Sequence, residues 1–284
     1  MDSWVLSLRA ERKSAATVKS YTDGVRAYLA AADGELLSRG SVGAWVAGLL
    51  DGGSQPATAR ARQLAVRRFS AWLAAEDEIP ADELVGMAPP QLDTKHVPVL
   101  STVQLQNLIA ACKGPEFRDR RDEAIIRLMA ETGARAGEVL GLAVTDVDLG
   151  QSVAVIRRGK GGKARTVPYG PRTAQAIDRY LRVRRRHRLA STATLWLGGG
   201  GKEFGYHALR ATLNRRAARA GIGHLHPHMF RHTAADRWLS AGGSESGLMA
   251  VAGWSRPEML MRYTRARAEQ RAADEARRLG LGDI

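Results

Sequence analysis

The sequence predicts a mainly helical protein with a small β-sheet, divided into two domains. Apolar residues recur at three- and four-residue steps in most segments, which is typical of helices packed on a core. One stretch in the middle instead shows the alternation and glycine-rich tip of a β-hairpin. The 284 residues exceed the usual size of a single core. We therefore expect one domain over residues 1–80 and a larger one over 98–284, joined by a proline-rich linker over 81–97.

Three helices are expected in the N-terminal domain. The first spans 14–32 with Ser14 as its N-cap, and its inner face holds Val18, Tyr21, Val25, Tyr28, Leu29 and Ala32. The second spans 41–52, between Gly40 and the Gly52-Gly53 pair. The third spans 56–76 and begins with a proline in its first turn, and its inner face holds Ala61, Ala65, Phe69, Trp72 and Leu73.

The C-terminal domain combines helices with the hairpin. Helical patterns cover 101–112 and 120–133, and Gly133 stands where a helix C-cap is expected. The segment SVAVIRRGKGGKARTVPY then switches to β-branched alternation around a glycine-rich tip, which predicts a hairpin. Further helical segments follow to the C-terminus. Together these elements indicate an α+β domain.

The charge is concentrated in the C-terminal part of the chain. The net charge of +14 indicates a polyanionic partner. Residues 1–97 hold 11 Lys and Arg against 12 Asp and Glu, whereas residues 98–284 hold 32 against 17. The helix over 56–76 is a local exception, because it lacks acidic residues before Glu76 and carries Arg60, Arg62, Arg67 and Arg68. We interpret it as a phosphate-facing helix, the alternative being an ordinary solvated face.

Several classes of protein are excluded by the sequence. No apolar run approaches the ~18 to 20 residues that span a bilayer, so no membrane contact is expected. Cys112 is the sole cysteine and can form neither an internal disulfide nor a cysteine-type metal site. The glycine-rich stretches lack the spacing of a nucleotide-binding P-loop, and no HExxH motif is present. We therefore expect an intracellular protein that needs no metal and no cofactor.

Four ordered motifs carry the candidate chemistry. ETGARAGEVLGL places Arg135 after a helix end and Glu138 one turn later, and RRGKGGKARTVP places Lys160 at the hairpin tip. HPHMFRH contains His228 and Arg231 one helical turn apart. VAGWSRPEMLMRYT contains Trp254 and Tyr263. Taken singly, such residues are usually surface charges or packing groups, and only their order along the chain is specific.

In this order the motifs closely resemble the tyrosine recombinase family, also called the phage integrase family, over nearly the whole chain. The resemblance implies an N-terminal helical, SAM-like domain that binds a DNA core site and a C-terminal catalytic domain. It also implies a compact member without an arm-binding domain. By the same resemblance Arg135 and Arg231 clamp the scissile phosphate, which suits a planar fork that is always charged. Tyr263 would be the nucleophile and form a 3′-phosphotyrosyl intermediate.

The other motif residues receive supporting roles from the resemblance. Lys160 would protonate the leaving 5′ hydroxyl, with Lys163 as the fallback. His228 would hydrogen-bond the phosphate or accept the tyrosine proton. Trp254 stands where the family more often has histidine. Its indole N–H would therefore position the phosphate by a hydrogen bond and would not transfer a proton. The alternative is a buried core side chain. Glu138 would orient His228 or an arginine.

The resemblance also implies partners and a setting. The partner would be double-stranded DNA at core attachment sites, bound by a homotetramer that exchanges a C-terminal tail, from about residue 265, in trans. The reaction would integrate or excise a phage or other mobile element at the nucleoid, in the cytoplasm of a bacterial host cell. Two alternatives stay open, a type IB topoisomerase-like strand transferase and a non-catalytic DNA-binding regulator. The Arg135-Ala-Gly-Glu138 box and the leading helical domain favour recombination.

Overall fold

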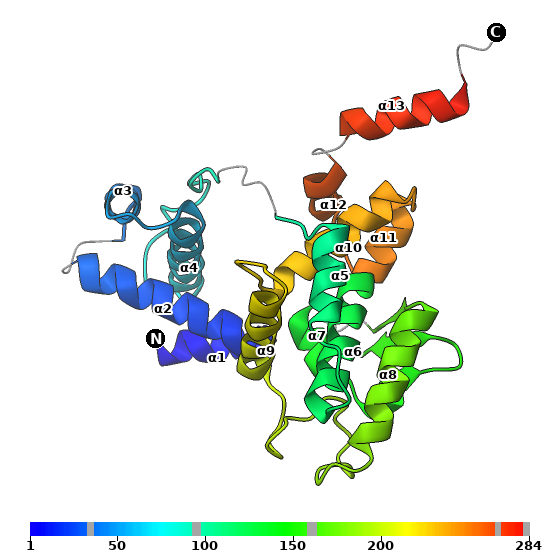
Figure 1. The fold of residues 1–284 in the computed structure, drawn as a ribbon. Helices are drawn as coiled ribbons and strands as arrows, with labels where there is room; N and C mark the ends of the chain where they lie inside the picture. The colour runs from blue at the N-terminus through cyan, green and yellow to red at the C-terminus, as the bar shows by residue number, and fades with distance from the viewer. Residues whose placement is uncertain (33–36, 93–97, 158–163, 265–267, 281–284) are drawn as a thin grey trace. The chain divides into compact units, whose positions relative to one another are not determined.

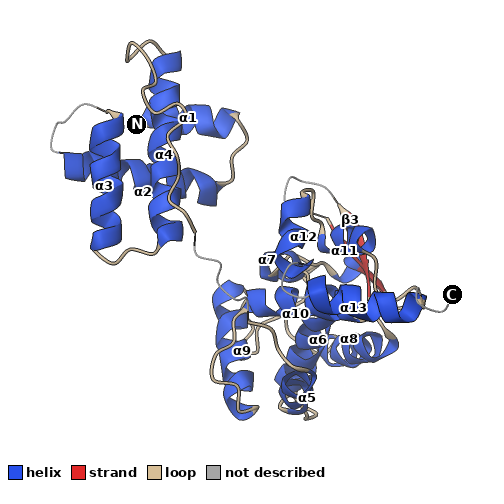
Figure 2. Ribbon diagram, turned by 90° about the horizontal axis from the view of Figure 1, so that it is seen from above, coloured by secondary structure: helices blue, strands red, loops and turns tan. Residues whose placement is uncertain are grey.

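The chain forms two compact units, Met1–His96 and Val97–Ile284 (Figure 1). The computed structural model describes residues 1–32, 37–92, 98–157, 164–264 and 268–280, with the backbone alone at 261–264, 268–272 and 274. Described residues are mostly helical, with one small sheet in the second unit (Figure 2). The expected fold class is thus confirmed.

The described residues of the first unit form four helices: α1 (Asp2–Ala10), α2 (Ala15–Ala32), α3 (Arg39–Asp51) and α4 (Pro56–Ala75). The packing of α2 on α4 depends on Gly24, because a Cβ there would lie 2.7 Å from the Cβ of Ala65. The sequence had not indicated α1. It buries Trp4, whose ring meets the edge of Phe69 with centroids 5.0 Å apart.

The expected inner faces of α2 and α4 are largely confirmed. The Ser14 hydroxyl caps α2 by accepting the backbone N–H of Thr17 at 3.1 Å. Two positions were assigned wrongly, because Leu29 and Ala61 are exposed. The inner face of α4 also includes Gln63, which is buried and donates its amide hydrogen to the carbonyl oxygen of Ala88 at 3.1 Å. A polar side chain with a backbone partner can thus take an inner place that periodicity reserves for apolar residues.

The beginning of the proline-rich segment differs from the expected linker. Leu84 is fully buried in the cluster that contains Tyr28 and Val42. The Asp82 carboxylate accepts the Ser70 hydroxyl at 2.5 Å and the backbone N–H of Leu84 at 3.0 Å. With the Gln63 contact, these bonds fix residues 82–88 on the first unit. One apolar anchor and a few hydrogen bonds order a stretch that lacks any period, so the connection begins near residue 89 rather than 81.

Nine helices of the described residues belong to the second unit. They are α5 (Thr102–Ala110), α6 (Phe117–Thr132), α7 (Ala136–Leu140), α8 (Pro171–Arg184), α9 (Tyr206–Arg219), α10 (Pro227–Ser240), α11 (Glu245–Ala252), α12 (Pro257–Thr264) and α13 (Ala268–Leu279). Helix α6 is central, because α5, α8 and α10 all pack against it. Its residues Ile125, Ile126 and Met129 are buried in the largest core cluster.

The sheet is antiparallel, with β1 (Val147–Asp148), β2 (Val153–Ile156) and β3 (Arg165–Pro168) in that order, after a short 3-10 turn (Val144–Asp146). Strands β2 and β3 form the expected hairpin, and β1 extends it by one strand. In the register Ile156 pairs with Arg165, so Arg165 opens β3 on the side of the hairpin tip. Residues 158–163 of that tip lie outside the described residues.

None of the described helices is both long enough and apolar enough to cross a membrane.

Candidate active site

The first part of the site is built where α6 ends. Gly133 closes the helix in the left-handed conformation with φ of 61°, and its N–H donates to the carbonyl oxygen of Met129 at 3.0 Å. The chain then turns at once into α7, with Arg135 as the extended residue before the first turn. Glu138 in that turn accepts the Arg135 backbone N–H at 2.8 Å and its guanidinium at 2.9 Å. A single carboxylate therefore fixes both the backbone and the side chain of Arg135.

Gly133→Ala should lower the free energy of unfolding by about 1–3 kcal/mol. An alanine is strained at φ of 61°, and its Cβ would lie 3.1 Å from that of Ala234. Gly137→Ala is the matched control, because its Cβ would meet nothing within 4 Å. Thermal or chemical unfolding of both variants measures the difference. Equal stability of the two variants would contradict the role given to Gly133.

Glu138 holds a second arginine, Arg165 of β3. The Arg165 guanidinium donates to both carboxylate oxygens, at 2.7 and 3.1 Å, and its Nε donates to the carbonyl oxygen of Val251 in α11 at 2.9 Å. Burial alone would raise the pKa of the Glu138 carboxyl, but the hydrogen bonds from Arg165 and Arg135 outweigh it and hold that pKa below its ordinary value. The carboxylate thus stays charged and joins α7, β3 and α11.

Arg165 is a residue of this site that the motifs did not predict. It lies within the quoted motif RRGKGGKARTVP, where only the two lysines were considered. Of the two kinds of partner expected for Glu138, the structure shows arginines. The signal available in the sequence was an arginine directly after the hairpin tip, at a position where a strand begins.

Arg231 of α10 joins two helix ends. Its side chain is 3 % exposed, and its guanidinium donates to the carbonyl oxygens of Gly133 at 3.0 Å and of Ala252 at 2.6 Å. The neighbouring Phe230 is fully buried in the main core and anchors this turn. Arg231 therefore fixes the C-terminus of α6, two residues before Arg135, against the C-terminus of α11.

Trp254 follows α11 and meets the same guanidinium. The guanidinium carbon of Arg231 lies 5.1 Å from the centroid of its ring, which is a cation–π distance. The indole is 6 % exposed and packs with Leu239, Leu248 and Leu260. Trp254 is therefore a packing residue, as one of its two interpretations expects, and its ring also contacts the guanidinium of Arg231.

Close approach at the end of α11 requires a glycine. Gly253 has φ of 65°, and a Cβ there would lie 3.0 Å from the guanidinium of Arg165. The tip of α11 thus lies against Arg165 through Val251 and Gly253, and against Arg231 through Ala252. Arginines from β3 and α10 converge on this one turn.

His228 lies three residues before Arg231, exposed in the first turn of α10. The ring of His226 caps the helix, with Nδ1 accepting the backbone N–H of His228 at 3.2 Å. Burial, with help from His224 and Arg210, lowers the pKa of His226, which suits a ring nitrogen that must accept a hydrogen bond. The His228 ring meets the edge of His232 with centroids 5.1 Å apart.

The remaining predicted residues are placed less fully. Lys160 and Lys163 lie outside the described residues. The backbone of Tyr263 lies in α12, which packs on α10 through Leu260. The side chain of Tyr263 is not among the described parts of the structure. The structure thus brings Arg135, Glu138, Arg231 and Trp254 together and adds Arg165.

The four arginines of α4 belong to the first unit. Arg60 and Arg68 are exposed, whereas Arg62 and Arg67 are half-buried. Arg68 donates to the Glu11 carboxylate at 3.1 Å, an exposed pair of small energetic weight. In the part of the chain that the structure describes, no group of three or more His, Cys, Asp or Glu side chains is arranged to hold a metal ion.

Both units match family models. Residues 98–270 match the phage integrase family, and residues 1–77 match the N-terminal SAM-like domain of phage integrases. The chain therefore belongs to the phage integrase family, as the order of its motifs predicts. The match to the phage integrase model covers α5 to α12 and therefore includes Arg135, Arg165 and Arg231.

Curated relatives define the enzyme more closely. A tyrosine recombinase XerC of Corynebacterium efficiens is 31 % identical over 91 % of this chain and 83 % of its own length. A tyrosine recombinase XerC of Pseudomonas aeruginosa is 29 % identical over 100 % of this chain and 97 % of its own length. The protein is a tyrosine recombinase, an enzyme of site-specific DNA recombination.

Solved structures share the fold. The XerA recombinase is 25 % identical with a TM-score of 0.55, over 92 % of this chain and 90 % of its own. The Tn1549 transposon integrase in complex with transposon right end DNA is 17 % identical with a TM-score of 0.75, over 94 % and 97 %. A lambda integrase dimer bound to a core site is 13 % identical with a TM-score of 0.71, over 92 % and 93 %. At these low identities the latter two support the fold alone.

Proposed function

We propose that the protein cleaves and rejoins DNA through a 3′-phosphotyrosyl bond to Tyr263. The observation that carries the proposal is the position of Arg231, whose buried guanidinium bonds the carbonyl oxygens of Gly133 and Ala252. Arg135 stands two residues beyond the first of these contacts, and Trp254 two residues beyond the second. Three of the residues proposed to handle one phosphate therefore belong to a single connected structure.

The proposed chemistry follows from these charges. The Tyr263 oxygen attacks the phosphorus, a bond forms between them, and the bond to the 5′ oxygen breaks. A phenol with an ordinary pKa near 10 needs surrounding cations to stabilise the phenolate as it forms, and Arg135 and Arg231 supply them. His228 accepts the tyrosine proton or bonds the phosphate, and Lys160 protonates the departing 5′ oxygen. A second 5′ hydroxyl reverses the step and rejoins the strand.

Glu138 and Arg165 are proposed as positioning residues. The carboxylate holds the guanidinium of Arg135 at 2.9 Å while Arg165 holds the carboxylate in turn. Oriented donors that need no rearrangement during the reaction are the most effective way to stabilise a developing charge. Trp254 supports the guanidinium of Arg231 in the same sense.

The proposed partner is double-stranded DNA at core attachment sites, with the Arg60 to Arg68 face of α4 contacting phosphates. We propose a homotetramer that exchanges the tail beyond residue 265. Support comes from α13, where Leu279 is 57 % exposed and Ala276 is also exposed, so this apolar face has room for a neighbouring subunit. Integration or excision of a phage or mobile element in a bacterial host is proposed from membership of the phage integrase family.

Tyr263→Phe should abolish the covalent complex, because phenylalanine lacks the attacking oxygen. Fragmented, nicked genomic DNA is offered to the protein, covalent complexes are isolated under denaturing conditions, and the attached DNA is sequenced. Tyr206→Phe is the control, since Tyr206 is an exposed residue of α9. An adduct that persists in Tyr263→Phe, or none in the unsubstituted protein, contradicts the proposal and favours a non-catalytic DNA-binding regulator.

The recovered sequence then separates recombination from topoisomerase-like strand transfer. Two duplexes of different length that carry this sequence should yield hybrid products with a recombinase. Relaxation of supercoiled DNA without hybrid products would favour the topoisomerase-like alternative.

A further inference from the structure

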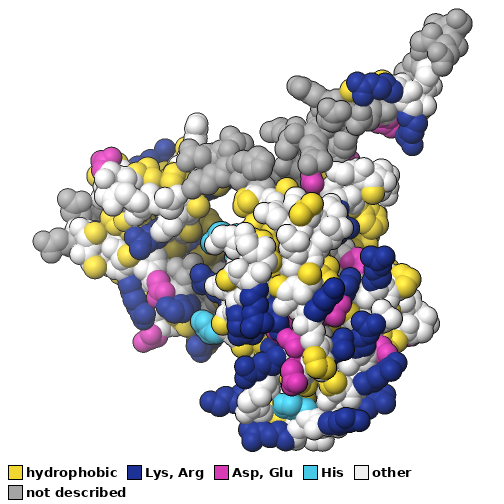
Figure 3. Space-filling model, in the orientation of Figure 1, with side chains coloured by type: hydrophobic (Ala, Val, Ile, Leu, Met, Phe, Trp, Pro, Cys, Tyr) yellow, Lys and Arg dark blue, Asp and Glu magenta, His cyan; other side chains and the backbone are white. Residues whose placement is uncertain are grey.

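A second basic site lies in the same unit, at the opposite end of α6 from Arg135. Here a cavity of about 450 Å³ is lined by the first turn of α6, by the end of α9 and by the loop after α8. Lys and Arg side chains (dark blue) gather over this lower part of the unit (Figure 3). Its charged lining residues are Arg118, Arg215, Arg216, Arg219, Glu116 and Asp119.

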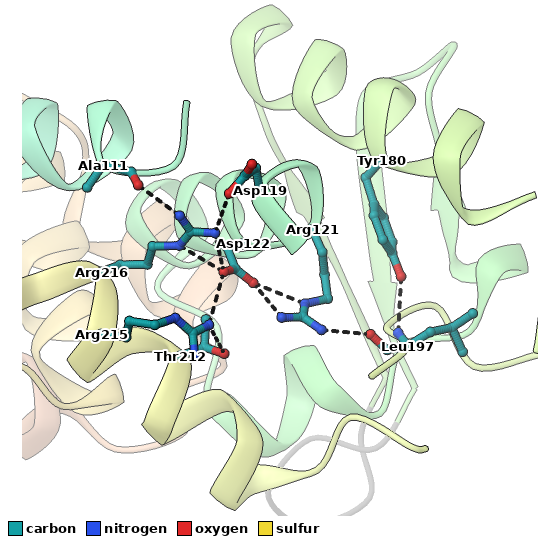
Figure 4. A network of polar contacts seen from close by, with 9 residues as sticks. All are labelled: Ala111, Asp119, Arg121, Asp122, Tyr180, Leu197, Thr212, Arg215 and Arg216. Carbon is teal, nitrogen blue, oxygen red and sulfur yellow. Dashed lines mark hydrogen bonds and ion pairs between the residues drawn. The ribbon is translucent and has the colours of Figure 1, made fainter. Parts of the chain in front are cut away.

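One of the four arginines is neutralised by its neighbours (Figure 4). Arg216 is buried and donates to Asp119 at 2.8 Å and to Asp122, also at 2.8 Å. Its third bond, of 2.9 Å, goes to the carbonyl oxygen of Ala111. Arg216 therefore has a structural role, joining α9 to α6 and to the end of α5, and its charge is compensated by Asp119 and Asp122.

The other three arginines keep most of their positive charge. Arg215 is 44 % exposed and lies 3.6 Å from the carboxylate of Asp122. That carboxylate already forms ion pairs with the buried Arg121 and Arg216, so it compensates little of the charge of Arg215. Among the described residues, no carboxylate lies within 4.0 Å of the guanidinium of Arg118 or Arg219. Besides Asp119, which is bonded to Arg216, the cavity lining contains one acidic residue, the exposed Glu116. The cavity is thus strongly cationic.

Part of the cavity wall is the glycine-rich loop of residues 198–201. A Cβ at Gly199 would lie 2.3 Å from Nε of Arg118, so the arginine lies directly on this glycine. Arg188 donates to the carbonyl oxygens of Gly200 and Gly201 at 3.1 and 3.0 Å. His187 accepts the N–H of Leu189 at Nδ1 and lies 3.1 Å from the carbonyl oxygen of Gly198 at Nε2, so Nε2 carries the hydrogen and donates it.

The cavity cannot share a phosphate with the catalytic arginines. Helix α6 starts at the cavity with Phe117 and ends beside Gly133 after 16 residues. At 1.5 Å per residue the two ends are separated by about 24 Å. A phosphate bound by Arg135 is therefore out of reach of Arg118 and Arg219.

We propose that this cavity and the exposed arginines beside it bind the phosphodiester backbone of DNA, at phosphates about 24 Å or more from the one held by the catalytic arginines. A polymer is favoured over a small anion because two further exposed arginines, Arg185 and Arg186, directly precede the lining residue His187 in the chain. Arginine binds phosphate oxygens two at a time, and such contacts carry no dependence on base sequence. The inference uses the DNA-binding class of the protein and not the proposed tyrosine chemistry.

Salt dependence of binding tests the proposal on the full chain. The full chain binds a non-specific duplex of about 60 base pairs, and each phosphate contact contributes about 0.9 to the slope of log affinity against log salt. Arg118→Gln with Arg219→Gln should reduce the slope by about 1–2. The control pair, Arg172→Gln with Arg179→Gln, removes the same charge from exposed positions of α8 and should change it less. Equal slopes for the two pairs would overturn the proposal.

A second pair of variants changes shape without changing charge. Gly199→Ala places a methyl group where Arg118 lies, whereas at Gly200 a Cβ meets nothing within 4 Å. Gly199→Ala should weaken duplex binding at least twofold at fixed salt, and Gly200→Ala should leave it unchanged.

The remaining arms identify the occupant and separate this proposal from the proposed function. Tripolyphosphate is titrated calorimetrically at fixed ionic strength. Arginine-dependent binding of tripolyphosphate with an unchanged duplex slope would mean a small-anion site and overturn the DNA assignment. Covalent-complex formation should stay at the level of the unsubstituted protein in both arginine pairs. Because duplex binding does not depend on the tyrosine, failure of the phosphotyrosyl proposal would leave the slope measurement intact.

Discussion

Arg231→Lys should slow formation of the covalent DNA complex by about 10²–10³-fold. Lysine keeps the positive charge but lacks the planar fork that bonds the carbonyl oxygens of Gly133 and Ala252 together. Two losses then coincide, since a donor to the phosphate is misplaced and the ends of α6 and α11 are no longer joined. Single-turnover trapping on a nicked substrate of the recovered target sequence measures the rate.

The stability of the variant decides how its rate is interpreted. Arg237→Lys is the matched control, being an exposed arginine on the same helix, α10. Thermal unfolding of both variants shows whether Arg231→Lys is folded at the assay temperature. A folded Arg231→Lys protein that forms the complex within twofold of the control rate would remove Arg231 from the proposed phosphate clamp.

Glu138→Gln should lower the free energy of unfolding by about 3 kcal/mol at neutral pH. The amide brings an NH₂ donor against guanidinium donors of Arg135 and Arg165, which now lack their shared negative charge. The rate of covalent-complex formation should fall as well, because the Arg135 side chain loses its support. Glu203→Gln, an exposed residue, is the control for the substitution itself.

The pH dependence of this effect has a fixed sign. Because the pKa of Glu138 lies below its ordinary value of 4.5 in the folded protein, its contribution to stability is fully present above that ordinary value. The contribution is lost as the pH falls through the lower folded pKa. Chemical denaturation from about pH 7 to pH 3 should therefore show a constant gap between the original protein and Glu138→Gln, narrowing only at the acidic end. A gap that widens on acidification would contradict the ion pair.

Local patterns were enough to predict much of the second unit. The C-cap at Gly133 and the hairpin around GKGGK follow from short-range backbone preferences, and the structure has both. Arg165 could not be predicted in the same way, because its role depends on contacts with Glu138 and Val251, 27 and 86 residues away in the sequence. The approach to α11 also requires the absence of a side chain at Gly253, which becomes meaningful only once the two elements are adjacent.

In the first unit, too, local patterns could be predicted from the sequence and long-range contacts could not. The apolar stripe of α2 and the Ser14 cap could be predicted from the sequence alone, whereas α1 was missed because nine residues offer too few repeats to define a period. Leu84 was assigned to a linker because prolines surround it. Its burial beside Tyr28 depends on an apolar cluster to which α2, α3 and α4 all contribute, and no local pattern reveals such a cluster.

The anchoring of Leu84 shortens the segment that connects the two units of the protein. Only residues 89–97 are left to connect them, and a chain of that length extends to at most about 30 Å. One turn of the DNA double helix is about 34 Å long. Even when fully extended, the connecting segment is therefore shorter than one turn of the duplex, and its length is set by the point at which Leu84 anchors the chain.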